Sequence, residues 1–259
     1  MARTASIALD LFARTEHHRY GAHRQNRADL HVPRDGEAPF PVVVLIHGGY
    51  WRATYGKIVM KPLAADLVRR GFATWNIEYR RIGRRQGGGY PATFDDVAAA
   101  IDCLASLDDP RLDLDDVTLM GHSAGGHLAL WATSREESKV RFRRVIAQAP
   151  ITNLVTTGAA AHVLMGGKPA ELPERYAAHD PMQLLPLGIP AAVVHGDDDM
   201  TISIERSREY VAAAGDGVEL IEPRPSGHRS HIDPRSPAWQ AAVEWLVSAR
   251  RSTSPQAAR

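Results

Sequence analysis

A lone serine stands between two glycines in the stretch G-H-S-A-G at residues 121–125. The apolar run before it is typical of a strand, and the run "HLALWATS" after it is typical of a helix. Such a turn strains the residue between the two elements, and β-carbons two positions to either side would meet the neighbouring chain. It also sets the hydroxyl at a helix N-terminus, where free N–H groups stabilise an anion. We therefore predict that Ser123 is a nucleophile, and a tight turn without chemistry is the alternative.

Three carboxylates follow a later apolar run, in "AAVVHGDDDMTIS" at residues 191–203. A serine nucleophile needs a base, and the base needs a carboxylate that orients its ring. We favour Asp199 as this carboxylate, because its separation from His195 leaves room for a turn that aims the side chain inward. Asp197 and Asp198 are the alternatives, although solvated or helix-capping roles suit them better.

The base is expected after the last predicted strand, where "PRPSGHRSHIDP" at residues 223–234 contains two histidines. We favour His228, because it directly follows Gly227 in the loop that leads to the final helix. His231 is expected to be structural and satisfied by the nearby carboxylate of Asp233. The same side chains are possible zinc ligands, but no helix aligns the two histidines and no partner cluster is evident. We therefore expect neither a metal nor a cofactor.

The string "HGGYW" at residues 47–51 ends the first strongly apolar strand. Glycines allow main-chain N–H groups to come close to a developing oxyanion. We expect Gly48, Gly49 and also Tyr50 to supply such donors, together with the N–H of Ala124 after the nucleophile. A generic turn at the end of a strand is the alternative.

These segments belong to an alternation of strands and helices, which predicts an α/β fold with a mostly parallel sheet covered on both faces. Thr93 is expected to cap one helix, and Ser236 the last one, with Pro237 at its first position. Strands are predicted at residues 41–49, 72–80, 115–121, 140–150, 190–196 and 217–223, and helices at residues 58–71, 93–107, 123–134, 203–215 and 236–250.

One segment breaks the alternation. Residues 151–186 contain several glycines and prolines between short apolar stretches, and we expect a lid or a wall of the substrate pocket there. The polar tail at residues 251–259 is expected to be disordered. We predict a single domain over residues 1–259.

Composition excludes several classes of protein. The net charge is +1 with 24% charged residues, which is typical of neither a nucleic-acid binder nor an acidic tail. A single cysteine allows no intrachain disulfide, and no stretch approaches the roughly 20 apolar residues of a membrane span. We expect a cytoplasmic protein, monomeric or homodimeric, that binds neither nucleic acid nor membranes.

At the level of motifs the sequence resembles the arylformamidase (kynurenine formamidase) and small-esterase group of α/β-hydrolases. "HGGYW" is similar to the group's H-G-G-x-W motif, "GHSAGGHLAL" to its nucleophile elbow, and "HGDDDMTIS" to an H-G-x-x-D-x-x-V-P pattern. "GHRSHIDPRSPAW" resembles a G/D-H-F-D-x-I-D-P stretch of bacterial members. The resemblance begins near Tyr20 and implies an α/β-hydrolase fold and a triad of Ser123, Asp199 and His228.

Arg229 departs from the group, whose members usually carry an aromatic residue directly after the catalytic histidine. The arginines of the loop "RRIGRRQGGGYP" at residues 80–91 would suit a substrate that bears a carboxylate, such as N-formylkynurenine, although a solvated loop is the simpler expectation. Substrate preference is therefore not transferred from the group.

We expect a serine hydrolase that cleaves a small ester or aryl-formamide bond through an acyl-enzyme. Tyr50 and Trp51 are candidates for contact with the substrate, as are Trp75 and Tyr79, and for the tryptophans ordinary core packing is an equal alternative. A serine peptidase and a non-catalytic ligand-binding protein on the hydrolase fold are the alternative functions.

Overall fold

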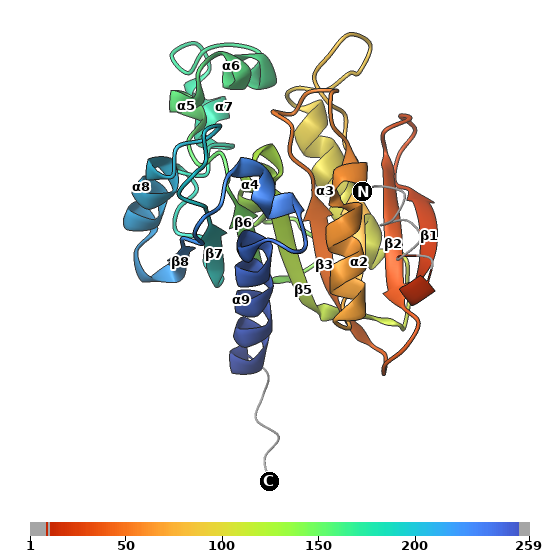
Figure 1. Cartoon of the computed structure of the whole chain (residues 1–259). Coiled ribbons are helices and arrows are strands. Elements are labelled where there is room, and N and C mark those ends of the chain that lie inside the picture. Colours follow the sequence, from red (N-terminus) through yellow and green to blue (C-terminus); the bar gives the residue numbers. More distant parts are fainter. Residues whose placement is uncertain (1–8, 10, 254–259) are drawn as a thin grey trace.

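A computed structural model describes residue 9 and residues 11–253 of the chain. The described strands form one eight-stranded sheet in the order β1-β2-β4-β3-β5-β6-β7-β8 (Figure 1). The strands from β3 to β8 pair in parallel, whereas β1 and β2 are antiparallel to their neighbours. Their bounds are β1 Ala13–Arg19, β2 Arg27–Pro33, β3 Phe40–Ile46, β4 Ala73–Ile77, β5 Leu112–His122, β6 Phe142–Gln148, β7 Ala191–Val194 and β8 Val218–Ile221.

Helices cover both faces of this sheet, because its central strands are apolar on both sides. In β3, Val42 and Val44 belong to one core cluster and Val43 and Leu45 to the other. The first cluster includes side chains of α3 and α4, and the second includes those of α2 and α9, which lie in front of the sheet in Figure 1. The helices are η1 Lys57–Met60, α2 Lys61–Arg69, α3 Ala92–Ala105, α4 Ala124–Ala132, α8 Glu205–Ala214, η2 Gly215–Gly217, η3 His228–Ile232 and α9 Pro237–Thr253.

Residues 151–186 contribute three short helices and no strand of the described sheet. They are α5 Leu154–Thr157, α6 Ala159–Met165 and α7 Pro173–Ala177, grouped at the top of Figure 1. The segment starts directly after β6 and returns to the sheet at β7. It therefore stands at the carboxyl ends of the parallel strands, where open α/β sheets bind their ligands.

Every strand and helix predicted from the sequence is present. β5 is longer than predicted, the other predicted strands are shorter, and the helix ends differ by up to about three residues. β1 and β2 are not predicted from the sequence, because polar side chains in both strands hide the alternation that identifies a strand. The cap at Ser236 is confirmed, since its Oγ accepts the Trp239 N–H at 3.1 Å.

The prediction that Thr93 caps a helix was wrong. Thr93 lies inside α3, and its hydroxyl accepts from Gly89 N–H at 2.9 Å and donates to the Arg80 carbonyl at 2.6 Å. It therefore fastens the preceding loop instead of capping the helix. Residues 251–253 of the predicted disordered tail continue α9, and residues 254–259 lie outside the described residues.

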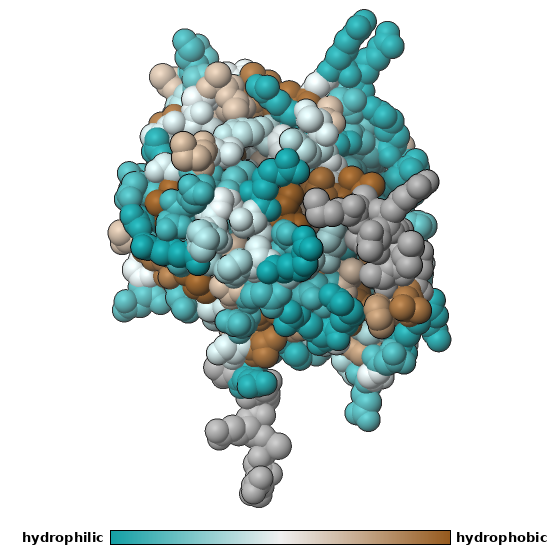
Figure 2. Space-filling model, in the orientation of Figure 1, coloured by the Kyte–Doolittle hydropathy of each residue, from teal (hydrophilic) through white to brown (hydrophobic). Residues whose placement is uncertain are grey.

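The surface shown in Figure 2 is mostly hydrophilic, with hydrophobic residues scattered over it in small groups. Scattered apolar residues are normal on soluble domains. Among the large exposed hydrophobic side chains are Tyr55, Ile58 and Met200. None of the described helices combines the length and the apolar character needed to cross a membrane.

The contact between β3, β5 and α4 leaves no room for side chains at two glycines. A β-carbon on Gly121 would lie less than 3.0 Å from the carbonyl oxygen of Gly125, and one on Gly125 equally close to that of Ile46. Because these neighbours are backbone atoms, they cannot move without displacing a central strand or the helix. The two glycines of the serine motif are therefore required by packing.

We predict that Gly125→Ala lowers the free energy of unfolding by at least about 2 kcal/mol, because the added methyl group overlaps the β3 backbone. Urea unfolding monitored by circular dichroism measures the loss. Gly217→Ala is the control, since nothing lies within 4 Å of a β-carbon there. Equal unfolding midpoints for the two variants would contradict the packing argument.

Candidate active site

Ser123 occupies the sharp turn between β5 and α4 with φ 56° and ψ −119°. A non-glycine residue with positive φ is strained, and such strain persists only where the surrounding structure imposes it. Here the Ser123 N–H donates to the Gln148 carbonyl at 2.8 Å, and the Ser123 carbonyl accepts the His127 N–H at 3.1 Å. These two bonds fix the turn between β6 and the first turn of α4.

The Ser123 and His228 side chains line the same pocket, which has a volume of about 230 Å³. Within the described residues no hydrogen bond joins the Ser123 hydroxyl to the His228 ring. Catalytic hydrogen bonds are often long in unliganded proteins and tighten when a substrate binds. The shared pocket therefore places a hydroxyl and an imidazole where one substrate can meet both.

Asp199 is the carboxylate that holds the His228 ring. Its Oδ2 accepts from His228 Nδ1 at 2.7 Å and from His195 Nε2 at 3.1 Å. Its Oδ1 accepts the N–H groups of Thr201 and Ile202 at 2.8 and 2.9 Å. Burial alone would raise the pKa of Asp199, but these bonds favour the ionised form and bring the pKa far below its usual range.

His195 holds the same carboxylate oxygen that His228 contacts. Its Nε2 faces the Asp199 carboxylate and the Ile202 carbonyl, at 3.1 and 3.0 Å, and both are acceptors. The ring must therefore carry its proton on Nε2, and Nδ1 accepts from the Ser207 hydroxyl at 2.7 Å. This role of His195 is not predicted from the sequence. Its place directly after a buried strand and four residues before Asp199 was the available signal.

A second buried histidine supports the loop that carries His228. His122 Nε2 donates to the His228 carbonyl at 3.0 Å. Burial lowers the pKa of His122 to about 3, so the ring stays neutral in ordinary buffers. His231 lies against it, with ring centroids 6.0 Å apart, and burial likewise lowers the pKa of His231 well below its ordinary value. Neutral rings thus surround the Asp199–His228 pair without adding charge.

The predicted oxyanion turn follows β3 and has an unusual backbone. Gly49, Tyr50 and Trp51 all have positive φ, at 114°, 51° and 58°. A β-carbon on Gly48 would lie less than 3.0 Å from the His122 carbonyl, so this turn approaches the serine turn closely. Ala124 is the first residue of α4, where an N–H has no acceptor within the helix. The Gly48, Gly49 and Ala124 backbones therefore surround the space next to the Ser123 side chain.

A buried ion pair that the sequence analysis missed supports this turn. His47 Nε2 donates to Glu78 Oε1 at 2.8 Å, and His47 Nδ1 donates to the Gly48 carbonyl at 2.8 Å. Burial alone would raise the pKa of Glu78, but His47, Arg81 and the Lys57 N–H outweigh it and lower this pKa. The acidic residue at the end of β4, beside the apolar strand that ends in "HGG", was the available signal.

Three of the four aromatic candidates for substrate contact are core residues. Trp51, Trp75 and Tyr79 are fully buried, and Trp51 packs edge-on against His127 at 5.3 Å between ring centroids. The prediction that Trp51 contacts the substrate is therefore wrong, since the positive φ of the turn directs its ring into the core. Tyr50 does line the pocket.

Tyr79 has a structural task instead of a binding one. Its ring stacks on His47 at 4.3 Å, and its hydroxyl donates to the His47 carbonyl at 2.8 Å. The stacked ring therefore holds the start of the oxyanion turn from the core side.

Charged residues near the site also differ from expectation. Asp233 pairs with Arg235 at 3.1 Å and not with His231, while Asp197 and Asp198 are exposed. Among the described residues, no group of three or more His, Cys, Asp or Glu side chains is placed to hold a metal ion.

The loop at residues 80–91 does not offer its first two arginines to a substrate. Arg80 forms two bonds with Asp96, at 2.9 and 2.7 Å, and Arg81 bonds the Tyr55 carbonyl. Arg229, in contrast, lines the serine pocket, is exposed and has no partner in the part of the chain that the structure describes.

The sheet order, the strained serine between β5 and α4, and the acidic and basic loops after β7 and β8 define an α/β-hydrolase fold. A family model described as BD-FAE matches residues 28–213, more than half of the chain. The chain belongs to this family.

Curated relatives match part of the chain. A probable isoprenylcysteine alpha-carbonyl methylesterase from Oryza sativa subsp. japonica is 32% identical over 121 residues, which are 46% of this chain and 28% of the relative. A kynurenine formamidase from Salmo salar is 27% identical over 120 residues, 46% of this chain and 38% of the relative. The chain thus spans well under half the length of these relatives.

Solved structures match nearly the whole chain. A truncated form of a carbohydrate esterase from gut microbiota has a TM-score of 0.80 at 19% identity, covering 93% of this chain and 98% of the other. An esterase B from Lactobacillus rhamnosis has a TM-score of 0.74 at 20% identity, covering 97% and 90%. At these identities the likeness shows the fold.

We predict that Asp199→Asn weakens the dependence of stability on pH. The folded pKa of Asp199 lies below the unfolded value of about 3.9. Its ionised form therefore stabilises the fold above that pH, and this contribution is lost as the pH falls through the folded pKa. Between about pH 4 and pH 2 the free energy of unfolding should fall less steeply in the variant, by up to about 1.4 kcal/mol per pH unit. Urea unfolding at several pH values measures the slopes.

Asp198→Asn is the matched control, because Asp198 is exposed and lies one residue away on the same loop. This variant should keep the wild-type slope. Identical slopes for wild type and Asp199→Asn would show that the buried hydrogen bonds do not favour the ionised carboxylate.

Proposed function

We propose that the protein is a serine hydrolase that cleaves small ester or aryl-formamide bonds through a triad of Ser123, His228 and Asp199. The observation that carries the proposal is the hydrogen bond of 2.7 Å from His228 Nδ1 to the buried Asp199 carboxylate. The His228 side chain lines the same pocket as the strained Ser123. The named relatives, a methylesterase and a formamidase, support this class of bond.

The reaction needs one proton relay. Ser123 Oγ attacks the carbonyl carbon while His228 Nε2 takes the hydroxyl proton, and Asp199 stabilises the resulting imidazolium. The N–H groups of Gly49 and Ala124, with Gly48 beside them, hold the oxyanion of the tetrahedral intermediate. When the carbonyl reforms, the bond to the leaving group breaks, and His228 returns its proton to the departing oxygen or nitrogen.

Water then completes the cycle. His228 takes a proton from a water molecule as its oxygen attacks the acyl-enzyme, and the second tetrahedral intermediate expels the Ser123 oxygen. The acid leaves, and the serine regains its proton from His228. Each step uses groups of this chain alone, so the proposed mechanism requires no cofactor.

The size and lining of the pocket favour small substrates. Its volume is about 230 Å³, and Tyr55, Val59 and Ile232 provide apolar surface next to the serine. Ester and formamide cleavage use the same nucleophile and the same oxyanion donors, so both belong to the proposal. A cytoplasmic location and a monomeric or homodimeric state stay expectations from the sequence.

We predict that Ser123→Ala lowers kcat/KM by at least about a thousandfold for p-nitrophenyl acetate and for N-formyl-L-kynurenine, because the variant cannot form an acyl-enzyme. Steady-state rates for both substrates, with wild type and variant side by side, measure the loss. A much faster wild-type reaction with N-formyl-L-kynurenine would identify an arylformamidase, and turnover of the ester alone an esterase.

A Ser123→Ala variant with the full wild-type rate would contradict the proposed nucleophile. A wild-type protein that hydrolyses neither substrate but binds one of them would instead favour a ligand-binding protein on this fold. Cleavage of peptide bonds in preference to both substrates would favour a peptidase.

We further predict that Glu78→Gln lowers kcat and kcat/KM together by about ten- to a hundredfold, because it removes the charge that holds His47 under the oxyanion turn. Glu244→Gln, an exposed position on α9, is the control and should keep the wild-type rate. An increase in KM at constant kcat would place the effect in ground-state binding and contradict this role.

A further inference from the structure

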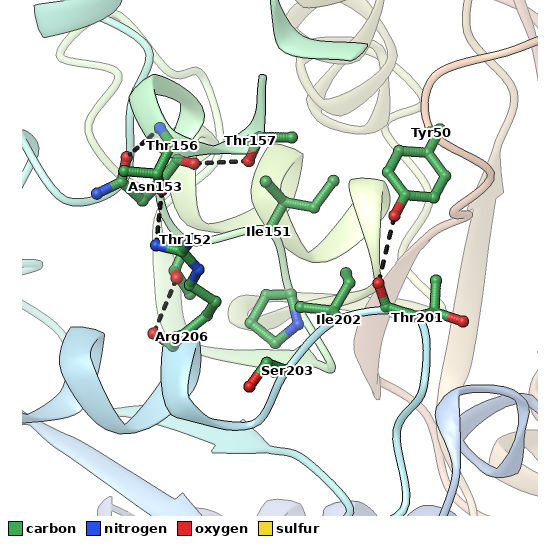
Figure 3. Close-up of a pocket in the computed structure, with 11 residues that line it drawn as sticks. Tyr50, Ile151, Thr152, Asn153, Thr156, Thr157, Thr201, Ile202, Ser203 and Arg206 are labelled. Carbon is green, nitrogen blue, oxygen red and sulfur yellow. Dashed lines mark hydrogen bonds between the residues drawn. The ribbon is translucent and has the colours of Figure 1, made fainter. Parts of the chain in front are cut away.

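A second pocket, with a volume of about 280 Å³, lies beside the serine pocket (Figure 3). Its walls come from residues 150–153, 156 and 157 after β6, residues 201–203 after the Asp199 turn, Arg206 of α8, and Tyr50. The proposed chemistry uses none of these side chains, and Tyr50 also lines the serine pocket.

The second pocket adjoins the nucleophile. Tyr50 and Thr201 line both pockets. Ile151 forms part of its wall, and the Ile151 N–H donates to the Ser123 carbonyl at 3.4 Å. A group attached to a carbonyl carbon at Ser123 can therefore extend into the second pocket without crossing the core.

A weak hydrogen bond joins the two residues that line both pockets. The Tyr50 hydroxyl donates to the Thr201 carbonyl at 3.5 Å, as Figure 3 shows. This distance is at the outer limit of a hydrogen bond and stabilises the closed position little. Within the described residues the Tyr50 hydroxyl makes no other hydrogen bond, so an acyl chain that passes this point must break only that bond and part of the packing of the ring against the core cluster.

The lining of the second pocket is rich in hydrogen-bond donors and has no acidic residue. Arg206 Nη1 donates to the Thr156 hydroxyl at 2.8 Å, which holds the guanidinium at the wall. Glu209 lies 3.7 Å from the same nitrogen but is 59% exposed and outside the lining. The Asn153 amide and the Ser203 hydroxyl add further donors. A carboxylate is the group that such a lining binds best, because the Arg206 guanidinium is a cation with several N–H donors and no acidic side chain belongs to the lining.

We propose that the second pocket is the acyl subsite and that it takes an acyl chain ending in a carboxylate, as in the half-ester of a dicarboxylic acid. This inference rests on the proposed function, which requires His228 to protonate the leaving group. The leaving group must then occupy the pocket that His228 lines, and the acyl chain extends the other way, past Tyr50. Arg206 is the specificity-determining residue of this subsite.

Two p-nitrophenyl esters with five-carbon acyl chains test the proposal: mono-p-nitrophenyl glutarate, with a terminal carboxylate, and p-nitrophenyl pentanoate, with a methyl group. The wild-type protein should prefer the glutarate in kcat/KM. Arg206→Met should reduce the ratio of the two kcat/KM values about five- to tenfold, as expected for a hydrogen-bonded charge partly open to water. High salt should reduce the wild-type ratio in the same direction.

Matched variants separate charge from structure. Arg208→Met removes another arginine of α8, one that pairs with Glu222 and Glu205 away from the pocket, and should keep the wild-type ratio. Thr156→Val removes the hydroxyl that accepts from Arg206 but keeps the guanidinium, so a preference for the glutarate should persist. Arg206→Lys keeps a positive charge and should retain part of the preference even if Arg206→Met does not fold.

Three outcomes would overturn the subsite: no wild-type preference for the glutarate, a preference that survives Arg206→Met, or one that only Arg229→Met abolishes. The last would place the carboxylate in the serine pocket. A wild-type protein that hydrolyses neither ester contradicts the proposed function instead. Calorimetric titration with free glutarate then decides the subsite, since binding weakened by Arg206→Met supports it and binding unchanged by that substitution overturns it.

Discussion

The close approach of β3, β5 and α4 at Gly121 and Gly125 is the constraint on which the site depends. Backbone carbonyls fill the space where β-carbons would stand, so the helix begins directly against two central strands. Only in this arrangement can Ser123 adopt its strained conformation with φ 56°. The same contact brings the first N–H groups of α4 and the turn after β3 to one point. The packing of β3, β5 and α4 therefore also determines where the Ser123 hydroxyl lies.

Around this point the protein stabilises the buried carboxylate of Asp199 with hydrogen-bond donors. Asp199 is buried with four donors on its two oxygens, and His195 and His122 each carry the proton that their acceptors demand. A buried charge is stable only when it is fully hydrogen-bonded. Burial lowers the pKa of His122 to about 3 and the pKa of His231 well below its ordinary value, so these two rings add no positive charge beside Asp199.

The turn after β3 serves two pockets at once. Its glycines face the serine, and its Tyr50 side chain forms the wall shared with the pocket lined by Arg206. The His47–Glu78 pair holds the turn through the Gly48 carbonyl, while the Tyr50 hydroxyl donates to the Thr201 carbonyl at 3.5 Å. The turn thus combines a backbone held next to Ser123 with a side chain that both pockets share.

The sequence by itself determined the alternation of strands and helices, the strained serine turn, and the pairing of Asp199 with His228. These features can be predicted because they depend on apolar runs, on glycines and on the order of loops along the chain, all of which can be read from the sequence alone. The sequence could not show that Trp51 and Tyr79 are buried. The residue type of an aromatic side chain beside a pocket motif does not indicate whether the ring points into the core or into the pocket.

Other features exist only in three dimensions. Glu78 meets His47 across neighbouring parallel strands, and Asp233 pairs with Arg235 instead of His231. The antiparallel pair β1 and β2 is recognisable only by its partner β4, because its own polar side chains carry no clear period. Long-range pairing decided each of these, since the free energy of a buried contact depends on residues that the chain brings together only when it is folded.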